Sequence, residues 1–319
     1  MKRVKKWSLA SLVVAGVMML GACGSSSVTK DTEKSSSEPQ EAVKVTDSNG
    51  ETVELKSHPK KVVVFDMGAL DTIKELGEAD KVVGAPTKTL PSYLSSFKNL
   101  ESAGGIKEPD MEKINAMQPD LIIISGRQED MKKELENIAP TLYLSVDNKK
   151  AWESTVENIE TLGTVFDKED VAKEKVDELT TKREALEKTT KESGKKGLMS
   201  LVNEGSLSVF GPESRFGIIY EGFGVIPADE AIEPSPHGQE VSYEYVLEKN
   251  PDILFVVDRT KAIGGDDSKN NVADNALVKE TTAGKEGKVI SLTPDVWYLA
   301  GGGIKDKQMM MEDVESAYK

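Results

Sequence analysis

Residues 110–127 read DMEKINAMQPDLIIISGR, and further along the chain residues 242–259 read SYEYVLEKNPDILFVVDR. The two stretches match position for position, with a glutamate near the start, Pro-Asp in the middle, an apolar run after it and an arginine at the end. A duplication of this kind predicts two similar structural units, and the other features of the chain are arranged around it.

Each copy predicts a short helix, a turn and a central parallel strand. Proline ends the amphipathic helix, and the apolar run that follows Pro-Asp is typical of a strand with both faces buried. Ligands of open α/β sheets bind at the carboxyl edge of the strands, so Arg127 and Arg259 are expected to face one crevice. Glu112 and Glu244 begin the preceding helices, which run antiparallel to the strands, and are expected in the outer layer of each unit.

One long charged segment separates the two copies. Residues 168–192 contain neither Pro nor Gly and are rich in Glu, Lys, Ala and Leu, which predicts a solvated helix with Asp167 as its N-cap. Strand and helix patterns alternate on both sides of it. We therefore predict an α/β protein of two lobes, residues 42–166 and 194–319, each with a central mostly parallel sheet flanked by helices. A linking helix over residues 167–193 would join them.

Shorter patterns predict further elements. Helices are expected over residues 128–138, 215–222 and 271–282. His237 lies in a proline-rich stretch, and Tyr298 follows Trp297 shortly before three glycines. Both residues are therefore expected on flexible loops of the second lobe, where they could overhang the crevice.

The amino terminus predicts export. Residues 1–6 carry four positive charges, and residues 9–20 are apolar apart from Ser11. At about 1.5 Å per residue this run makes roughly 18 Å of helix, too short for a hydrocarbon core of ~30 Å. Residues 1–22 are therefore interpreted as a signal peptide.

Cys23, the only cysteine, ends a Leu-Gly-Ala-Cys sequence that resembles a bacterial lipobox. Lipidation of Cys23 would anchor the mature chain in the cell membrane, on its extracellular or periplasmic face. Residues 23–41 are rich in Ser, Glu and Lys without periodicity, and are expected to form a flexible tether.

The net charge and the few arginines of the chain indicate which ligands it could bind. The formal net charge is −14, and removal of the four signal-peptide charges leaves about −18, which argues against nucleic acid as a partner. Only five of the 41 basic residues are arginines, and Arg127, Arg215 and Arg259 lie at element ends beside the predicted crevice. Arginine binds paired oxygens through a planar fork, so the three indicate an anionic ligand. Ion pairs within each lobe are the alternative interpretation.

These features together resemble a known family: the lipid-anchored, two-lobed, helix-linked binding proteins of bacterial ABC importers for ferric siderophores, especially petrobactin-type catecholates. The resemblance covers the whole chain. It implies a monomeric receptor without a cofactor or catalysis, which captures a ferric siderophore and passes it to a permease. It further implies that Arg127, Arg215 and Arg259 bind the ferric tris-catecholate, and that Glu112 and Glu244 dock on the permease. For the glutamates, complementing the helix dipole is the alternative role.

The resemblance also implies that His237 and Tyr298 bind the iron when the siderophore is tetradentate and leaves two positions open. A solvent-exposed histidine and a packed tyrosine are the alternatives. Haem or cobalamin could occupy the same fold, although neither needs three arginines. Direct zinc or manganese binding would call for more than the two histidines present, and an exported hydrolase would need a nucleophile motif that the chain lacks.

Overall fold

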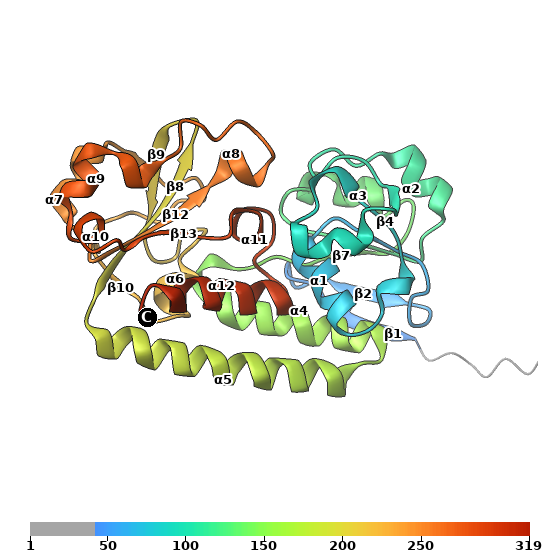
Figure 1. Ribbon diagram of the computed structural model, residues 1–319. Coiled ribbons are helices and arrows are strands. Elements are labelled where there is room, and N and C mark those ends of the chain that lie inside the picture. Colours follow the sequence, from blue (N-terminus) through green and yellow to red (C-terminus); the bar gives the residue numbers. More distant parts are fainter. Residues whose placement is uncertain (1–41) are drawn as a thin grey trace, which may run out of the picture. The chain divides into compact units, whose positions relative to one another are not determined.

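Two sheets and a hairpin organise residues 42–319, the part of the chain that the computed structural model describes (Figure 1). The expected signal peptide over residues 1–22, Cys23 and the expected tether up to residue 41 lie outside these residues. The hairpin pairs β1 (Val43–Thr46) with β2 (Thr52–Leu55) in antiparallel fashion and adds to the predicted elements.

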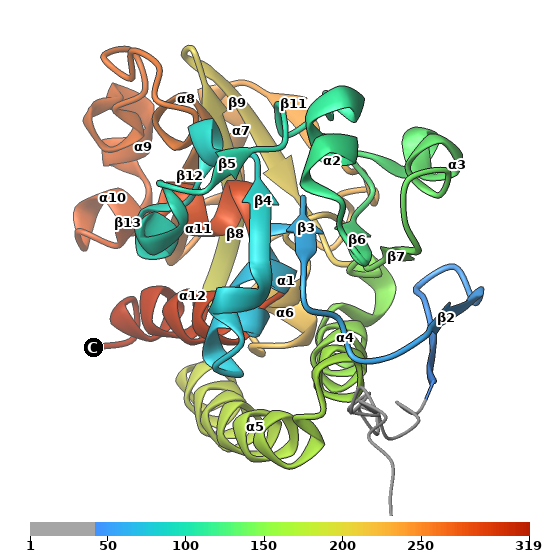
Figure 2. The same cartoon turned by 90° about the vertical axis from the view of Figure 1, so that its right-hand side faces the viewer.

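The sheet of the first lobe is entirely parallel, in the order β5-β4-β3-β6-β7 (Figure 2). Helices cover both of its faces, because the strands carry apolar side chains on both sides. The strands are β3 (Val62–Val64), β4 (Val82–Ala85), β5 (Glu101–Ser102), β6 (Leu121–Ile124) and β7 (Thr141–Tyr143). The helices are α1 (Met67–Glu75), α2 (Met111–Met117), α3 (Lys132–Leu135) and α4 (Ala151–Phe166).

The sheet of the second lobe is mixed, in the order β11-β9-β8-β12-β13, with β10 also pairing with β8. β8, β10, β12 and β13 run parallel, whereas β9 returns antiparallel through a two-residue turn in which Glu204 and Gly205 both have positive φ. The strands are β8 (Lys196–Asn203), β9 (Ser206–Phe210), β10 (Ile226–Pro227), β11 (Gln239–Val241), β12 (Ile253–Asp258) and β13 (Val289–Ser291). The helices are α6 (Ile218–Glu221), α7 (Tyr243–Lys249), α8 (Arg259–Ala262), α9 (Ala276–Glu280), α10 (Thr282–Lys285), α11 (Pro294–Leu299) and α12 (Ile304–Ser316).

The duplicated stretches fold alike, as α2–β6 in one lobe and α7–β12 in the other. Gln118 and Asn250 end the two helices in the left-handed conformation, with φ of 48° and 42°. Asp120 and Asp252 then bind backbone N–H groups at the start of the neighbouring strand, at 2.8 Å from Lys60 and from Lys196 respectively. The repeat therefore specifies both the turn and the strand pairing of each lobe, and the predicted fold class is confirmed.

Both faces of the repeat strands are buried, as their apolar runs predict. In β6, Ile123 joins the core shared with α1 and α4, whereas Ile122 and Ile124 join a second core beneath α2 and α3. β12 behaves in the same way, since Phe255 packs on the inner side and Leu254 beneath α7 and α9. The helix of each repeat thus forms the outer layer of its lobe.

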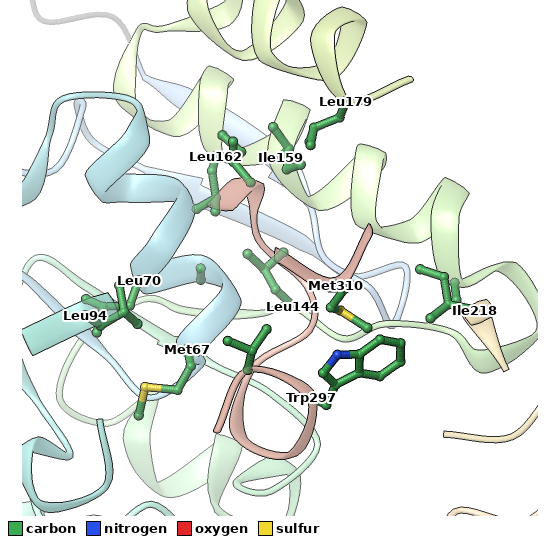
Figure 3. Packing of buried hydrophobic residues seen from close by; sticks show 14 of the residues in the cluster. Met67, Leu70, Leu94, Leu144, Ile159, Leu162, Leu179, Ile218, Trp297 and Met310 are labelled. Carbon is green, nitrogen blue, oxygen red and sulfur yellow. The ribbon is translucent and has the colours of Figure 1, made fainter. Parts of the chain in front are cut away.

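One long helix, α5 (Glu169–Ser193), runs along both lobes (Figure 1). Its buried side chains, among them Leu179, belong to a continuous core that includes Leu70 of the first lobe and Trp297 and Met310 of the second (Figure 3). The closing helix α12 contacts both α5 and α1. The two lobes therefore share one core as well as the covalent link.

The predicted cap of the linking helix is wrong. Asp167 has φ 57° and caps the carboxyl end of α4, and Lys168 precedes α5 without a side-chain cap. The physical reason is the short connection between the two helices. The chain must reverse within two residues, and aspartate is one of the few residues that adopts the left-handed conformation readily.

The three shorter helix predictions are each too long. Over residues 128–138 the chain forms a 3₁₀ turn and α3, because the buried side chain of Gln128 binds the backbone of Ser125 and Ile106 instead of facing outward from a helix. Over residues 271–282, Asn275 is extended and caps a new helix, α9. The helix expected from Arg215 begins only at Ile218, which leaves Arg215 on a turn.

Candidate functional site

The three arginines predicted for the crevice meet at Tyr298. Arg127 follows β6 of the first lobe, Arg215 lies on the turn after β9, and Arg259 is the first residue of α8. Arg127 donates from Nη2 to the carbonyl oxygen of Tyr298 at 3.1 Å, and Arg215 donates from Nη2 to the same oxygen at 2.5 Å. Arg259 donates from Nε to the phenol oxygen of Tyr298 at 2.8 Å. Three arginines from two lobes thus converge on one residue.

Tyr298 lies in helix α11, so the expectation of a flexible loop is wrong for it. Pro294 at the start of the helix and the buried Trp297 hold α11 against the core. The indole Nε1 of Trp297 also donates to Asp313 Oδ2 at 2.9 Å. The phenol is therefore presented from a packed helix.

The ring of Tyr298 stacks against two of the three guanidinium groups. The Cζ atom of Arg215 lies 4.4 Å from the ring centroid, and that of Arg259 lies 5.5 Å away. Arg259 is further held by its Nη1 donating to Asn203 Oδ1 at 2.8 Å. These contacts fix the arginines in position while the aromatic face offsets part of their mutual repulsion.

The electrostatics of this cluster would favour an anion. Burial opposes ionisation of the phenol, but the hydrogen bond and charge of Arg259, together with Arg215, outweigh burial and lower the pKa of Tyr298. Burial, followed by the nearby charge of Arg127, lowers the pKa of Arg215. Guanidinium groups remain protonated even so, and no carboxylate of residues 42–319 forms an ion pair with Arg127, Arg215 or Arg259. An incoming anion would supply the missing counter-charge.

A cavity of about 460 Å³ adjoins the cluster, a size that suits a small-molecule ligand. Residues from both lobes line it. The charged and polar members of the lining include Asp66, Ser125, Arg127, Asn148, Arg215, His237 and Lys307, and the apolar members include Val146, Phe216, Trp297 and Met310.

His237 lies on an exposed loop, as predicted, and on the wall of this cavity. Its only hydrogen bond within residues 42–319 joins its backbone N–H to Ser235 Oγ at 3.2 Å. His237 therefore lines the same cavity as Arg127 and Arg215, but forms no hydrogen bond with Tyr298. Their joint role in binding iron stays a prediction.

The sequence patterns missed two ionisable residues of the cavity. Asp66 caps α1, accepting from the N–H of Ala69 at 2.7 Å, and burial raises the pKa of its carboxyl group. Lys307 is only 1% exposed, and burial lowers the pKa of its amine. Asp66 could have been noticed as an N-cap at the end of a parallel strand, whereas nothing in the sequence distinguishes Lys307 from the many other lysines.

Glu112 and Glu244 are exposed in the first turns of α2 and α7, in the outer layer where they were expected. A hydrogen bond from Ser242 lowers the pKa of Glu244. Neither residue contributes to the arginine cluster. Their geometry is compatible with a contact to another protein, and with favourable interaction with the helix dipole.

Two further properties concern residues 42–319 as a whole. No group of three or more His, Cys, Asp or Glu side chains there is arranged to hold a metal ion. The helices in the same range are all too short or too polar to cross a bilayer. Cys23, the expected lipidation site, lies outside the described residues.

Comparison with known proteins gives consistent matches over most of the chain. Residues 62–296 match the family described as periplasmic binding protein. The petrobactin-binding protein YclQ of Bacillus subtilis (strain 168) is 43% identical over 98% of both chains. The ferric-anguibactin-binding protein FatB of Vibrio anguillarum is 33% identical over 85% of both chains.

Solved structures agree with these sequence matches. The crystal structure of YclQ from Bacillus subtilis has a TM-score of 0.86 at 44% identity, covering 88% of this chain and 99% of YclQ. The iron uptake ABC transporter substrate-binding protein PiuA from Streptococcus pneumoniae has a TM-score of 0.84 at 45% identity, covering 88% of this chain and all of PiuA.

Proposed function

Because the chain belongs to the periplasmic binding protein family, we propose that it captures a ferric catecholate siderophore of the petrobactin type and delivers it to an ABC permease for iron uptake. The observation that carries this proposal is the convergence of Arg127, Arg215 and Arg259 on Tyr298 between the two lobes. The site binds its ligand and makes or breaks no covalent bond.

Charge complementarity supports a catecholate. Three catecholates contribute six negative charges and ferric iron three positive ones, so the hexadentate complex carries a net charge of about −3, which three guanidinium groups can balance. Each charge-assisted hydrogen bond contributes roughly 1.5–3 kcal/mol. The relatives named for petrobactin and ferric anguibactin support a siderophore complex as the ligand.

The proposal is tested by titrating the purified protein with ferric petrobactin, ferric enterobactin, a ferric hydroxamate and hemin. Trp297, which lines the cavity, should report binding through its fluorescence. We expect ferric catecholates to bind more tightly than the hydroxamate or hemin. Preference for hemin, with a shift of its Soret band, would contradict the proposal and favour haem binding.

The arginines are tested by replacement with glutamine. One Arg→Gln change at Arg127, Arg215 or Arg259 should weaken ferric catecholate binding about ten- to a hundredfold, since one charge-assisted contact is lost. Arg183→Gln is the matched control, because Arg183 lies on α5 and pairs with Glu187 at 2.9 Å, away from the cluster. If a triple Arg→Gln variant bound ferric catecholate as tightly as the parent protein, the assignment of the three arginines to the ligand site would be wrong.

Location and partners complete the proposal. A lipid on Cys23 would hold the receptor at the outer face of the cell membrane, and residues 23–41 would give it reach. Glu112 and Glu244 would contact the permease, one from each lobe. Labelling of cells with a palmitate analogue tests the anchor, since Cys23→Ala should abolish incorporation.

A further inference from the structure

Lys307 is the most deeply buried cationic side chain of the cavity wall. It lies in the first turn of α12, is 1% exposed, and borders the same cavity as Arg127 and Arg215. Its Nζ donates to the carbonyl oxygen of Gly301. Within residues 42–319, no carboxylate oxygen lies within ion-pair distance of this nitrogen.

The local structure explains why Lys307 has no counter-ion. The neighbouring carboxylate, Asp306, forms no ion pair with it and accepts through Oδ2 from the N–H groups of Gly301, Gly302 and Gly303 at 3.0, 3.1 and 2.9 Å. The glycine turn thus occupies Oδ2, whereas Oδ1 of Asp306 is buried without a hydrogen-bond partner among the described residues. The turn also approaches Asp71 so closely that Gly303 has no room for a side chain. The amine of Lys307, a residue that borders the cavity, thus has one backbone acceptor, Gly301, for three possible donors.

We propose that Lys307 is a fourth cationic ligand-binding residue, whose amine contacts an anionic oxygen of the bound complex and takes up a proton as the complex enters. This inference rests on the proposed capture of an anionic ferric complex in the same cavity. A buried ammonium without a partner is costly, and an anion placed beside it in a site of low dielectric constant stabilises the charged form.

The direction of the proton transfer follows from the groups around the amine. Burial lowers the pKa of Lys307, and Asp306 on the same helix acts in the opposite direction. Asp66, Arg127, Arg215 and His237 line the same cavity. Asp71 of α1, which packs on α12, is a second buried carboxyl group next to Asp306, and its Oδ2 accepts from the N–H of Asp306 at 3.0 Å. A bound anion raises the pKa of the amine again, so proton uptake is expected at pH values between the lowered pKa of the free protein and the higher pKa of the complex. Affinity should fall as pH rises through this range.

The test compares Lys307→Gln with the parent protein, using hexadentate ferric enterobactin as the probe. Glutamine keeps a donor for the Gly301 carbonyl but removes the charge. We expect affinity to fall about tenfold or more. Calorimetry over a series of alkaline pH values, in buffers of different ionisation enthalpy, should show less proton uptake by the variant than by the parent protein. Lys305→Gln is the matched control, since Lys305 lies on the same helix but does not line the cavity.

The outcomes separate the two proposals. If the parent protein does not bind the probe, the proposed function fails and the role of Lys307 with it. If the parent binds and Lys307→Gln binds equally well, only the role of Lys307 is overturned. If Lys307→Gln does not fold, Tyr298→Phe is measured instead. This variant keeps the amine of Lys307 but has no phenol that could accept the proton. Absence of proton uptake by Tyr298→Phe on binding the probe would then overturn the proposal.

Discussion

Tyr298 combines three contacts in one residue. Its carbonyl oxygen accepts hydrogen bonds from Arg127 and Arg215, and its phenol oxygen accepts one from Arg259. Its ring faces the guanidinium groups of Arg215 and Arg259. The lowered pKa of Tyr298 favours ionisation of the phenol, as coordination to ferric iron, a hard Lewis acid, would require. We expect Tyr298→Phe to weaken a tetradentate ferric bis-catecholate by about tenfold and to change its visible charge-transfer band, while a hexadentate complex binds nearly as before.

The phenylalanine variant isolates the phenol, because it keeps the backbone carbonyl and the aromatic ring. His237→Ala should have the same selective effect if the imidazole fills the second open position on the iron. His58→Ala is its control, since His58 binds the carbonyl oxygen of Val165 at 2.9 Å, outside the cavity. Equal losses of affinity for tetradentate and hexadentate complexes, or an unchanged charge-transfer band in both variants, would contradict iron binding. Tyr298 would then be a packing residue and His237 a solvent-exposed one.

At the scale of elements, α2 and α7 are the repeated helices that cover the outer faces of the two sheets. Each presents an exposed glutamate in its first turn, Glu112 and Glu244. Charges at the rim of an interface act mainly on association and register with a partner. We therefore expect Glu112→Ala and Glu244→Ala to leave ferric siderophore affinity unchanged, and to lower iron uptake by cells several-fold.

Glu248→Ala provides the control for the second helix, because Glu248 is exposed on α7 beyond its first turn. Uptake in this variant should match that of the parent. Loss of siderophore affinity in purified Glu112→Ala or Glu244→Ala would assign these residues to the binding site or to folding instead of docking.

At the scale of the whole molecule, three features oppose large movement of the lobes. The linking helix α5 is continuous, the inner core extends through both lobes, and α12 closes the second lobe while packing on α1 of the first. The N–H of Asp306 also donates to Asp71 Oδ2 at 3.0 Å across this contact. We expect X-ray scattering profiles with and without ferric siderophore to superimpose closely, since a continuous linking helix and a core shared by both lobes resist a large rotation.

A fall of several ångströms in the radius of gyration on ligand binding would contradict this expectation. The contact between α1 and the glycine turn would then have to open, because the backbones of Gly68 and Gly302 approach so closely that a Cβ at Gly68 would lie 2.6 Å from Gly302 C. X-ray scattering of the unmodified protein with and without ligand therefore distinguishes a rigid receptor from one whose lobes close on the ligand.

The sequence by itself determined the local features of the fold. The repeat specified two helix–turn–strand units, because a left-handed residue, Pro-Asp and an apolar run act through neighbours in the chain. The charged segment without Pro or Gly specified the linking helix. Arg127 and Arg259 could each be placed at the carboxyl end of a central strand, because each follows the apolar run of its repeat.

Only the tertiary structure decided how these parts meet. Tyr298 belongs to a packed helix that brings three arginines together, and the core that holds this helix comes from segments far apart in the chain. Asp167 ends one helix instead of starting the next, because the spatial reversal between α4 and α5 outweighs its preference as an N-cap. Lys307 became distinct from the other lysines only through its burial beside the cavity, since the cost of a buried charge depends on neighbours that folding alone assembles.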